Sequence, residues 1–155
     1  MNTLLRFYAG VGTDNVGRTL EQVLAWKDET LEYTHDYIQW LFPNRQASQF
    51  NLNAPLLTDD DVKHFRKSPE LIENIRRAHA RMCKFYKIAV GPPFWWDDLR
   101  YSHNWLRMTR IMLCLCEVGL MKEADEFHSA ISQASLPDTR TRSFWFAAAG
   151  KPTDP

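Results

Sequence analysis

The sequence predicts an all-α protein, and three observations support that prediction. Apolar residues recur every three or four positions in most segments, which is the period of an amphipathic helix. No segment alternates apolar and polar residues for more than a few positions, as a half-buried strand would. Pro and Gly residues separate segments of helical length. We expect a compact single-domain bundle of about six to seven helices over residues 1–150, and a flexible C-terminal tail at residues 151–155.

Composition restricts the class of protein. A chain of 155 residues and 18.2 kDa is long enough to bury one sizeable core. Its 19 basic and 19 acidic residues cancel, so net charge gives no support for a bulk attraction to nucleic acid or anionic lipid. No apolar run approaches the roughly 18 residues that span a bilayer. The N-terminus lacks a secretory signal, and three cysteines fit reduced thiols, so we expect a cytoplasmic protein without membrane insertion.

Charge is uneven along the chain. Residues 63–87 hold eight basic and two acidic side chains, whereas residues 14–36 hold two basic and six acidic ones. Either the two segments pair with one another or face solvent, or the basic segment forms a binding patch. We favour the first interpretation, because charged runs are usually solvated or paired.

The first long helix is predicted to begin after Thr19. Thr19 and Gln22 have the spacing of a capping box, in which each side chain binds the other residue's backbone amide. From residue 20 to residue 42 the apolar residues form two stripes, one aliphatic and one aromatic. The aromatic stripe consists of Trp26, Tyr33, Tyr37 and Trp40. A helix that is apolar on two sides is usually sandwiched between neighbours. We therefore expect residues 20–42 to form the central, aromatic-rich helix.

Two further helices follow after residue 55. Thr58 precedes three aspartates at residues 59–61, which suits a helix start because the helix dipole favours carboxylates there. A cap is preferred to a metal site, since no further ligand is spaced to complete a cage. Pro69 is predicted to open the next helix. Its apolar stripe, which predicts a core face, is Leu71, Ile75, Ala78, Met82 and Phe85.

Three helices are predicted beyond the break at residues 91–93. The first covers residues 104–118, and its inward face is expected to carry Leu106, Thr109, Leu113 and Cys116. Ala124, Phe127 and Ile131 mark a shorter helix, and residues 144–149 form the last one. Cys114 and Cys116 point about 200° apart on a helix, so they do not share a metal there. We expect neither a metal site nor a cofactor.

A polar group on the helix over residues 104–118 is the first candidate site. His103, Arg107 and Arg110 align on one face, with Asn104 beside them. Two guanidinium groups in adjacent turns can clamp a carboxylate or a phosphate. The alternative is structural: the arginines pair with acidic residues of the central helix, such as Glu32 or Asp36. The spacing leaves both open, with structural pairing favoured.

An aromatic group at the end of the central helix is the second candidate. Tyr37, Trp40, Phe42 and Pro43 either pack in the core, which is the commoner role of such a stripe, or line a groove beside Arg45. Rings and Arg are frequent anchors of recognition surfaces. Trp95 and Trp96 lie in a Pro-flanked loop and form a further candidate recognition surface.

These segments together resemble one known family. The blocks are DNVGRTL at residues 14–20, HDYIQWLFPNR at 35–45, FNLNAPLLT at 50–58, FRKSPELIENIRRAHARMCKFY at 65–86 and HNWLRMTRI at 103–111. They resemble the opioid growth factor receptor conserved region, in the short form known from bacteria and fungi. The resemblance covers most of the chain, from Phe7 to about Ile131. The chain departs from the pattern at Gln46-Ala47, where many relatives carry Glu-Pro, and at Lys87, where many carry Gly.

The resemblance implies an all-helical domain and, from vertebrate members, a receptor for the pentapeptide Met-enkephalin. We therefore expect a non-catalytic binding module whose partner is a short peptide or a small anionic ligand. The first alternative is a phosphate or nucleic-acid binder that uses the basic residues 63–87 with Arg107 and Arg110. The second is an unrecognised enzyme. The sequence offers that enzyme neither a histidine pair with zinc-ligand spacing nor a Gly-rich phosphate loop.

Overall fold

The computed structural model describes residues 1–151, and this part of the chain is helical. It contains nine α-helices, one short 3-10 helix and no strand beyond an isolated bridge between Asn44 and Leu56. The all-α prediction is therefore confirmed. The predicted tail at residues 151–155 lies outside the described residues except for Lys151.

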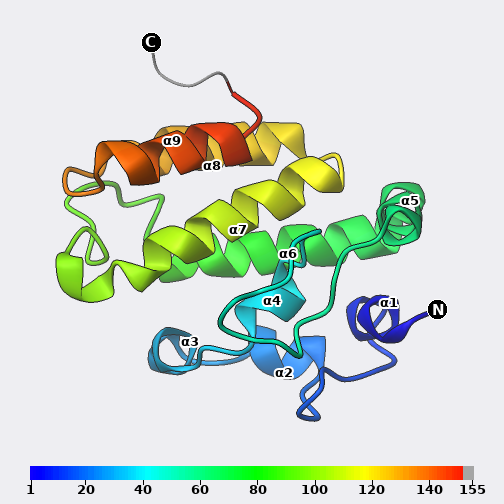
Figure 1. The fold of residues 1–155 in the computed structure, drawn as a ribbon. Coiled ribbons are helices and arrows are strands. Elements are labelled where there is room, and N and C mark those ends of the chain that lie inside the picture. The colour runs from blue at the N-terminus through cyan, green and yellow to red at the C-terminus, as the bar shows by residue number, and fades with distance from the viewer. Residues whose placement is uncertain (152–155) are drawn as a thin grey trace. The chain divides into compact units, whose positions relative to one another are not determined.

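The chain divides into two units, Met1–Arg81 and Met82–Pro155, each described here by itself. Along the chain the helices are α1 Thr3–Tyr8, α2 Leu20–Leu24, α3 Asp28–Tyr33, α4 Ile38–Leu41, α5 Asp59–Lys67, α6 Pro69–Phe85, the 3-10 helix Leu99–Tyr101, α7 His103–Glu117, α8 Met121–Ile131 and α9 Thr139–Ala148 (Figure 1). The helix α6 begins in the first unit and ends in the second. A single domain over residues 1–150 stays a prediction.

Local capping signals place three helix starts where the sequence predicts them. The Thr19 amide donates to Gln22 Oε1 at 2.8 Å, and the Gln22 amide donates to Thr19 Oγ1 at 3.1 Å. Thr58 and Asp61 form the same reciprocal box at the start of α5. Pro69 is the first residue of α6. These pairings satisfy amides that have no intrahelical acceptor.

The prediction of one central helix over residues 20–42 is wrong, because the segment folds as α2, α3 and α4. Side chains take the carbonyl oxygens that a continuous helix would use. The Tyr37 hydroxyl donates to the Leu31 carbonyl at 2.8 Å. The guanidinium of Arg18 donates to the Asp36 carbonyl at 3.3 Å. With these acceptors occupied, the backbone turns at residues 34–37 instead of continuing. This division accounts for most of the difference between the nine α-helices in the described residues and the six to seven predicted.

The helix α1 has no counterpart among the predicted helices. Asn2 caps it by accepting from the Leu5 amide at 2.9 Å, and the Asn2 amide group donates to Asp61 at 2.6 Å. The Tyr8 hydroxyl donates to the Leu41 carbonyl, and Asn74 donates to the Tyr8 carbonyl at 2.8 Å. Through these bonds α1 is held against α4, α5 and α6 within the first unit.

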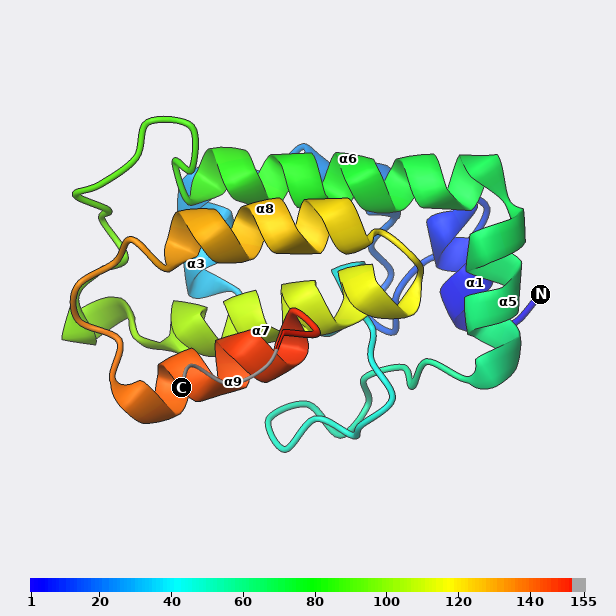
Figure 2. The ribbon, with the colours of Figure 1, turned by 90° about the horizontal axis from the view of Figure 1, so that it is seen from above.

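In the second unit α8 and α9 both pack against α7 (Figures 1 and 2). The buried face of α7 carries Trp105, Met108, Ile111, Met112 and Leu115. The predicted inward face is therefore wrong: Leu106 is exposed, and Thr109, Leu113 and Cys116 are partly exposed. The helix α7 has two adjacent apolar stripes. The stripe with the larger side chains, which includes Trp105, Met108 and Met112, fills the core.

Indole groups tie the segments of the second unit together. Trp96 donates to the Tyr86 carbonyl at 3.0 Å, Trp105 donates to the Trp96 carbonyl at 3.1 Å, and Trp145 donates to the Trp105 carbonyl at 3.1 Å. Trp96 and Trp145 are fully buried. A buried indole N–H needs an acceptor, so each ring fills the core and also donates a hydrogen bond to a backbone carbonyl. These bonds link the loop before α7 to α7, and α7 to α9.

Candidate functional site

Three of the predicted aromatic site residues, with Pro43, are buried in the structure. Tyr37 and Phe42 have no exposed surface, Trp40 is 3% exposed, and Pro43 is buried as well. The Trp40 indole donates to Asn15 Oδ1 at 3.1 Å, and its ring meets Phe7 edge to face at 5.4 Å between centroids. This burial matches the packing alternative of the sequence analysis. A direct ligand contact by these four residues stays a prediction.

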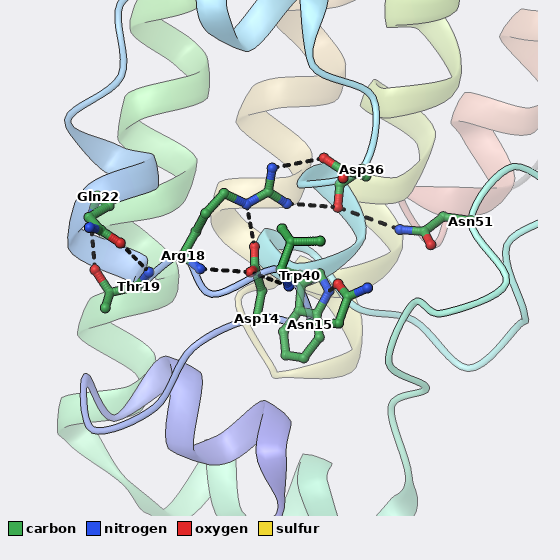
Figure 3. Close-up of polar contacts among 9 residues, drawn as sticks. Asp14, Asn15, Arg18, Thr19, Gln22, Asp36, Trp40 and Asn51 are labelled. Atoms are coloured by element: carbon green, nitrogen blue, oxygen red, sulfur yellow. Dashed lines mark hydrogen bonds and ion pairs between the residues drawn. The ribbon is translucent and has the colours of Figure 1, made fainter.

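A polar cluster built on Arg18 lies beside Trp40 (Figure 3). Asp14 accepts from the Arg18 Nε at 2.6 Å and from the backbone amides of Val16 and Arg18 at 3.0 and 2.9 Å. The other end of the guanidinium reaches the Asp36 carboxylate at 2.8 Å. Burial alone would lower the pKa of Arg18, but the hydrogen bonds to Asp14 and Asp36 outweigh it and raise that pKa. The cluster joins the turn before α2 to the turn before α4.

A closed loop over residues 45–56, which we call the 45–56 loop, follows the buried aromatic residues. Its two ends meet where Asn44 and Leu56 form a bridge and the Leu57 amide donates to the Asn44 carbonyl at 2.9 Å. Figure 2 shows the two arms coming together on the way to α5. Arg45 is the first residue of the loop, and its guanidinium binds Asp59 Oδ1 at 2.6 Å. Chains closed in this way form compact surface loops that often carry function.

The tip of the 45–56 loop contacts the rest of the first unit and displays apolar side chains. The Ser48 hydroxyl accepts from the amides of Phe50 and Asn51 at 3.2 and 3.1 Å. The Asn51 side chain donates to the Asp36 carbonyl at 3.5 Å, as Figure 3 shows. On either side of Asn51, Phe50 is 82% exposed and Leu52 is 88% exposed. Neither residue is among the site candidates predicted from the sequence. The sequence feature that could have identified them is a pair of apolar residues within a polar, Pro-containing loop.

The predicted polar site on α7 is formed from side chains of differing exposure. Asn104 is fully buried, Arg107 is buried, and His103 and Arg110 are partly exposed. Asn104 Oδ1 accepts from the Tyr86 hydroxyl at 3.0 Å and from Arg107 Nη1 at 3.4 Å. The Asn104 amide lies 3.3 Å from His103 Nε2. The structure thus brings three of the four together, around an asparagine that is part of the core.

Burial also governs the ionisation of groups further along α7 and near the end of α6. It lowers the pKa of Arg110, although the nearby Cys114 sulfur acts in the opposite direction. It raises the pKa of the buried Cys114 thiol, and it raises the pKa of Cys83 to about 12. Thiols with raised pKa values are poor nucleophiles. The described residues contain no group of His, Cys, Asp and Glu side chains that could hold a metal ion.

The uneven charge noted in the sequence is partly used in ion pairs within the first unit. Arg77 of α6 binds Glu21 of α2 at 2.6 Å, and Arg81 binds Asp28 of α3 at 2.8 Å. The expectation that the acidic and basic segments face one another is confirmed for these two pairs. Among the helices that the structure describes, none is both long and apolar enough to cross a bilayer.

His128 of α8 is expected to make the stability of the protein depend on pH. It is buried, its ring meets Phe146 edge to face, and the Lys151 ammonium lies 3.1 Å from Nδ1. Burial lowers the pKa of His128 below its ordinary value of 6.5, Lys151 lowers that pKa further, and Asp125 partly offsets both. As the pH falls through about 6.5, the unfolded chain gains a proton at this position before the folded protein does.

We therefore expect the contribution of His128 to the free energy of unfolding to be fully present above about pH 6.5. It should decline as the pH falls from there toward the lower folded pKa of His128. Thermal melting of the wild type and His128→Gln between pH 7.5 and 5 measures this dependence. His64→Gln, which replaces an exposed histidine of α5, is the matched control. A pH dependence that is unchanged in His128→Gln would contradict the assignment.

The family model and the related proteins that match this chain all carry the same family name. The family model described as the opioid growth factor receptor (OGFr) conserved region matches residues 2–92. The opioid growth factor receptor of Mus musculus is 38% identical over 120 residues, which cover 67% of this chain and 19% of that protein. Opioid growth factor receptor-like protein 1 of Mus musculus is 34% identical over 157 residues, 88% of this chain and 34% of that protein. The opioid growth factor receptor of Homo sapiens is 34% identical over 142 residues, 81% and 20% of the two chains.

The chain thus spans about a fifth to a third of the length of these relatives. No solved structure matches it. The matched region, residues 2–92, contains the Arg18 cluster and the 45–56 loop, whereas the polar residues of α7 lie beyond it.

Proposed function

Because this chain belongs to the opioid growth factor receptor conserved-region family, we propose that it is a receptor-like binding module without catalysis, and that its ligand is a short peptide. The family relatives are named as receptors, which supports a binding role. A reducing, cytoplasmic location is part of the proposal, and the three free cysteines suit it. The chain covers a minor part of each relative, so the activity of those whole proteins enters here as a proposal too.

The peptide proposal rests on the exposed ion pair that Arg45 forms with Asp59. The Arg45 side chain is 41% exposed and its ion-pair partner Asp59 is 81% exposed. An ion pair this open contributes roughly 0–1 kcal/mol, because water competes for both groups. A ligand carboxylate can therefore compete with Asp59 for the guanidinium, and a guanidinium binds a carboxylate with two parallel hydrogen bonds. A short peptide with a free C-terminus supplies such a group.

The polar residues of α7 are less suited to the same role. Asn104 and Arg107 are buried and already share hydrogen bonds with Tyr86 and with each other. A ligand would have to break these bonds and leave a buried polar group unsatisfied, which costs about 1–3 kcal/mol. We therefore assign the peptide carboxylate to Arg45 and retain His103, Asn104, Arg107 and Arg110 as the second candidate set.

The phosphate or nucleic-acid alternative draws on the exposed cations of α5, namely Lys63, Arg66 and Lys67. It has less support, because Arg77 and Arg81 already pair with acidic residues of the same unit. The two proposals differ in their response to salt. Binding to a polyanion falls steeply as salt rises, through counterion release, whereas one carboxylate contact changes little.

Titration calorimetry with Met-enkephalin tests the proposal. We expect saturable binding with a Kd in the micromolar range or tighter, and a loss of up to about fivefold in Arg45→Ala, because an exposed ion pair contributes roughly 0–1 kcal/mol. Met-enkephalin amide, which lacks the carboxylate, should lose a similar factor.

Arg77→Ala is the matched control, since Arg77 is 42% exposed and also forms a 2.6 Å pair with a carboxylate. It should bind like the wild type. Absence of binding by the wild type at millimolar peptide would overturn the proposal. Equal losses in Arg45→Ala and Arg77→Ala would show that the effect is not specific to Arg45.

A further inference from the structure

We propose that Lys151, His128 and Asp125 form a pH-sensitive latch, which holds the end of α9 against α8 while the His128 ring is neutral and releases it when that ring gains a proton. All three residues belong to the second unit, outside the segment to which the peptide ligand is assigned. Mildly acid conditions are thus expected to loosen one end of α9 before they unfold the protein.

The end of α9 holds Lys151 in a fixed position. The helix closes in a Schellman motif, in which the Gly150 amide donates to the Ala147 carbonyl at 3.1 Å. The Lys151 amide donates to the Phe146 carbonyl at 2.9 Å. Gly150 has a φ of 72°, a left-handed conformation that glycine adopts without a Cβ clash. The Phe146 ring meets the His128 ring at 4.7 Å between centroids, so one helix end brings both a ring and an ammonium group to His128.

In the closed latch Lys151 contacts two groups of α8. Its Nζ lies 3.1 Å from His128 Nδ1 and 2.5 Å from a carboxylate oxygen of Asp125. An ammonium group has only donors, so Nδ1 accepts, and the neutral ring carries its own proton on Nε2. That nitrogen lies 3.5 Å from the Ser132 hydroxyl oxygen. The closed latch therefore requires His128 to be neutral.

A proton on Nδ1 removes the acceptor and places two positive charges 3.1 Å apart. Water screens them little, because His128 is only 3% exposed. Among the described residues, the charged groups that act on His128 are Lys151 and Asp125, and α7, which also packs against α8, contributes none. Burial lowers the pKa of His128, Lys151 lowers it further, and Asp125 partly offsets both. The closed latch therefore binds a proton less tightly than the open one does.

Asp125 gives the released state a partner for the new charge. It precedes His128 by three residues on α8, so the two side chains are neighbours on one face of the helix. The Asp125 side chain is 60% exposed, which leaves it room to turn. An imidazolium donates from both ring nitrogens, whereas the neutral ring donates from one. We expect Asp125 to exchange Lys151 for His128 when the ring is protonated.

The size of the effect follows from the proton linkage. Above about pH 6.5, the ordinary pKa of histidine, the ring is neutral in both states and the opening equilibrium does not depend on pH. Between that value and the lower pKa of the closed latch, only the open state gains the proton. The equilibrium constant for opening should then rise by up to about tenfold for each pH unit.

Amide hydrogen exchange of the wild-type protein between pH 7.5 and 5 measures the opening. Protection factors, which correct for the intrinsic pH dependence of exchange, should fall at Ala149, Gly150 and Lys151, whose amides close the end of α9. The amide of Ile111, in the core of α7, should keep its protection, which distinguishes local release from unfolding.

His128→Gln removes the titrating group, so its protection factors at the end of α9 should not depend on pH. A fall that persists in His128→Gln would overturn the latch. Wild-type amides that keep their protection down to pH 5 would overturn it as well, and so would amides at the end of α9 that are already unprotected at pH 7.5.

Titration of the His128 ring by nuclear magnetic resonance tests its two partners with surface substitutions. Lys151→Met removes the nearby cation and should raise the pKa of His128, whereas Asp125→Asn removes the carboxylate and should lower it. Lys122→Met is the matched control, because Lys122 lies on the same helix, is 83% exposed and is 3.8 Å from Glu126. It should leave the pKa unchanged. A His128 pKa that does not respond to Lys151→Met, or responds equally to Lys122→Met, would overturn the latch.

Discussion

Trp40→Ala is expected to lower the free energy of unfolding by about 3–5 kcal/mol, the usual range for removing a buried large aromatic side chain. The ring is 3% exposed and meets Phe7 edge to face at 5.4 Å. Its indole donates to Asn15 Oδ1 at 3.1 Å, and alanine would leave that acceptor without this donor. Urea denaturation followed by circular dichroism measures the change.

Two other substitutions make the Trp40 result interpretable. Trp40→Phe keeps most of the apolar volume and loses the indole hydrogen bond, so its effect should be clearly smaller. Tyr33→Ala removes an aromatic ring that is 77% exposed, and it should change stability by less than about 1 kcal/mol. A small effect of Trp40→Ala would mean that the ring is not part of the core. The groove interpretation of the aromatic residues would then gain support.

Arg18→Ala is expected to lower the free energy of unfolding by about 3 kcal/mol, because it leaves the Asp14 carboxylate buried without its cation. The Asp14 side chain has no exposed surface and the Arg18 side chain is 18% exposed. The loss is moderated by the two backbone amides that continue to bind Asp14. Arg18→Ala also frees the Asp36 carbonyl at the turn before α4, so the variant should perturb the anchor of the 45–56 loop as well.

Arg77→Ala is the control for Arg18→Ala. It breaks an exposed ion pair with Glu21, and such pairs contribute about 0–1 kcal/mol. Equal effects of the two substitutions, measured by the same denaturation experiment, would show that burial of Asp14 has no energetic consequence. That result would contradict the role given to the Arg18 cluster.

The fold is predictable from the sequence where a few neighbouring residues decide the structure. The starts of α2, α5 and α6 depend on Thr19, Thr58 and Pro69 with residues no more than three positions away. The break between α3 and α4 involves Arg18 and Tyr37, which reach the carbonyl oxygens of Asp36 and Leu31. Such competition requires the tertiary placement of side chains, which hydrophobic periodicity does not contain.

The candidate site is predictable to a smaller extent for the same reason. The helical period places Tyr37 and Trp40 on one stripe, Phe42 follows them at the predicted helix end, and the structure buries all three. The exposure of Phe50 and Leu52 is known only from the fold, as is the contact between the Asn51 side chain and the Asp36 carbonyl, which lies fifteen residues away along the chain. On α7 the two apolar stripes are equally periodic, and the bulk of Trp105, Met108 and Met112 decides which one is buried.

The peptide-receptor function is tested most directly by a nuclear magnetic resonance titration of the isotope-labelled wild-type protein with Met-enkephalin. The measurement follows backbone amide shifts residue by residue, so it reports both whether the peptide binds and where. We expect saturable shifts concentrated at residues 45–56 and at Asp59, the partner of Arg45. Saturable shifts centred on His103, Asn104, Arg107 and Arg110 would place the site on α7 instead. An unchanged spectrum at millimolar peptide would contradict the peptide-receptor function itself.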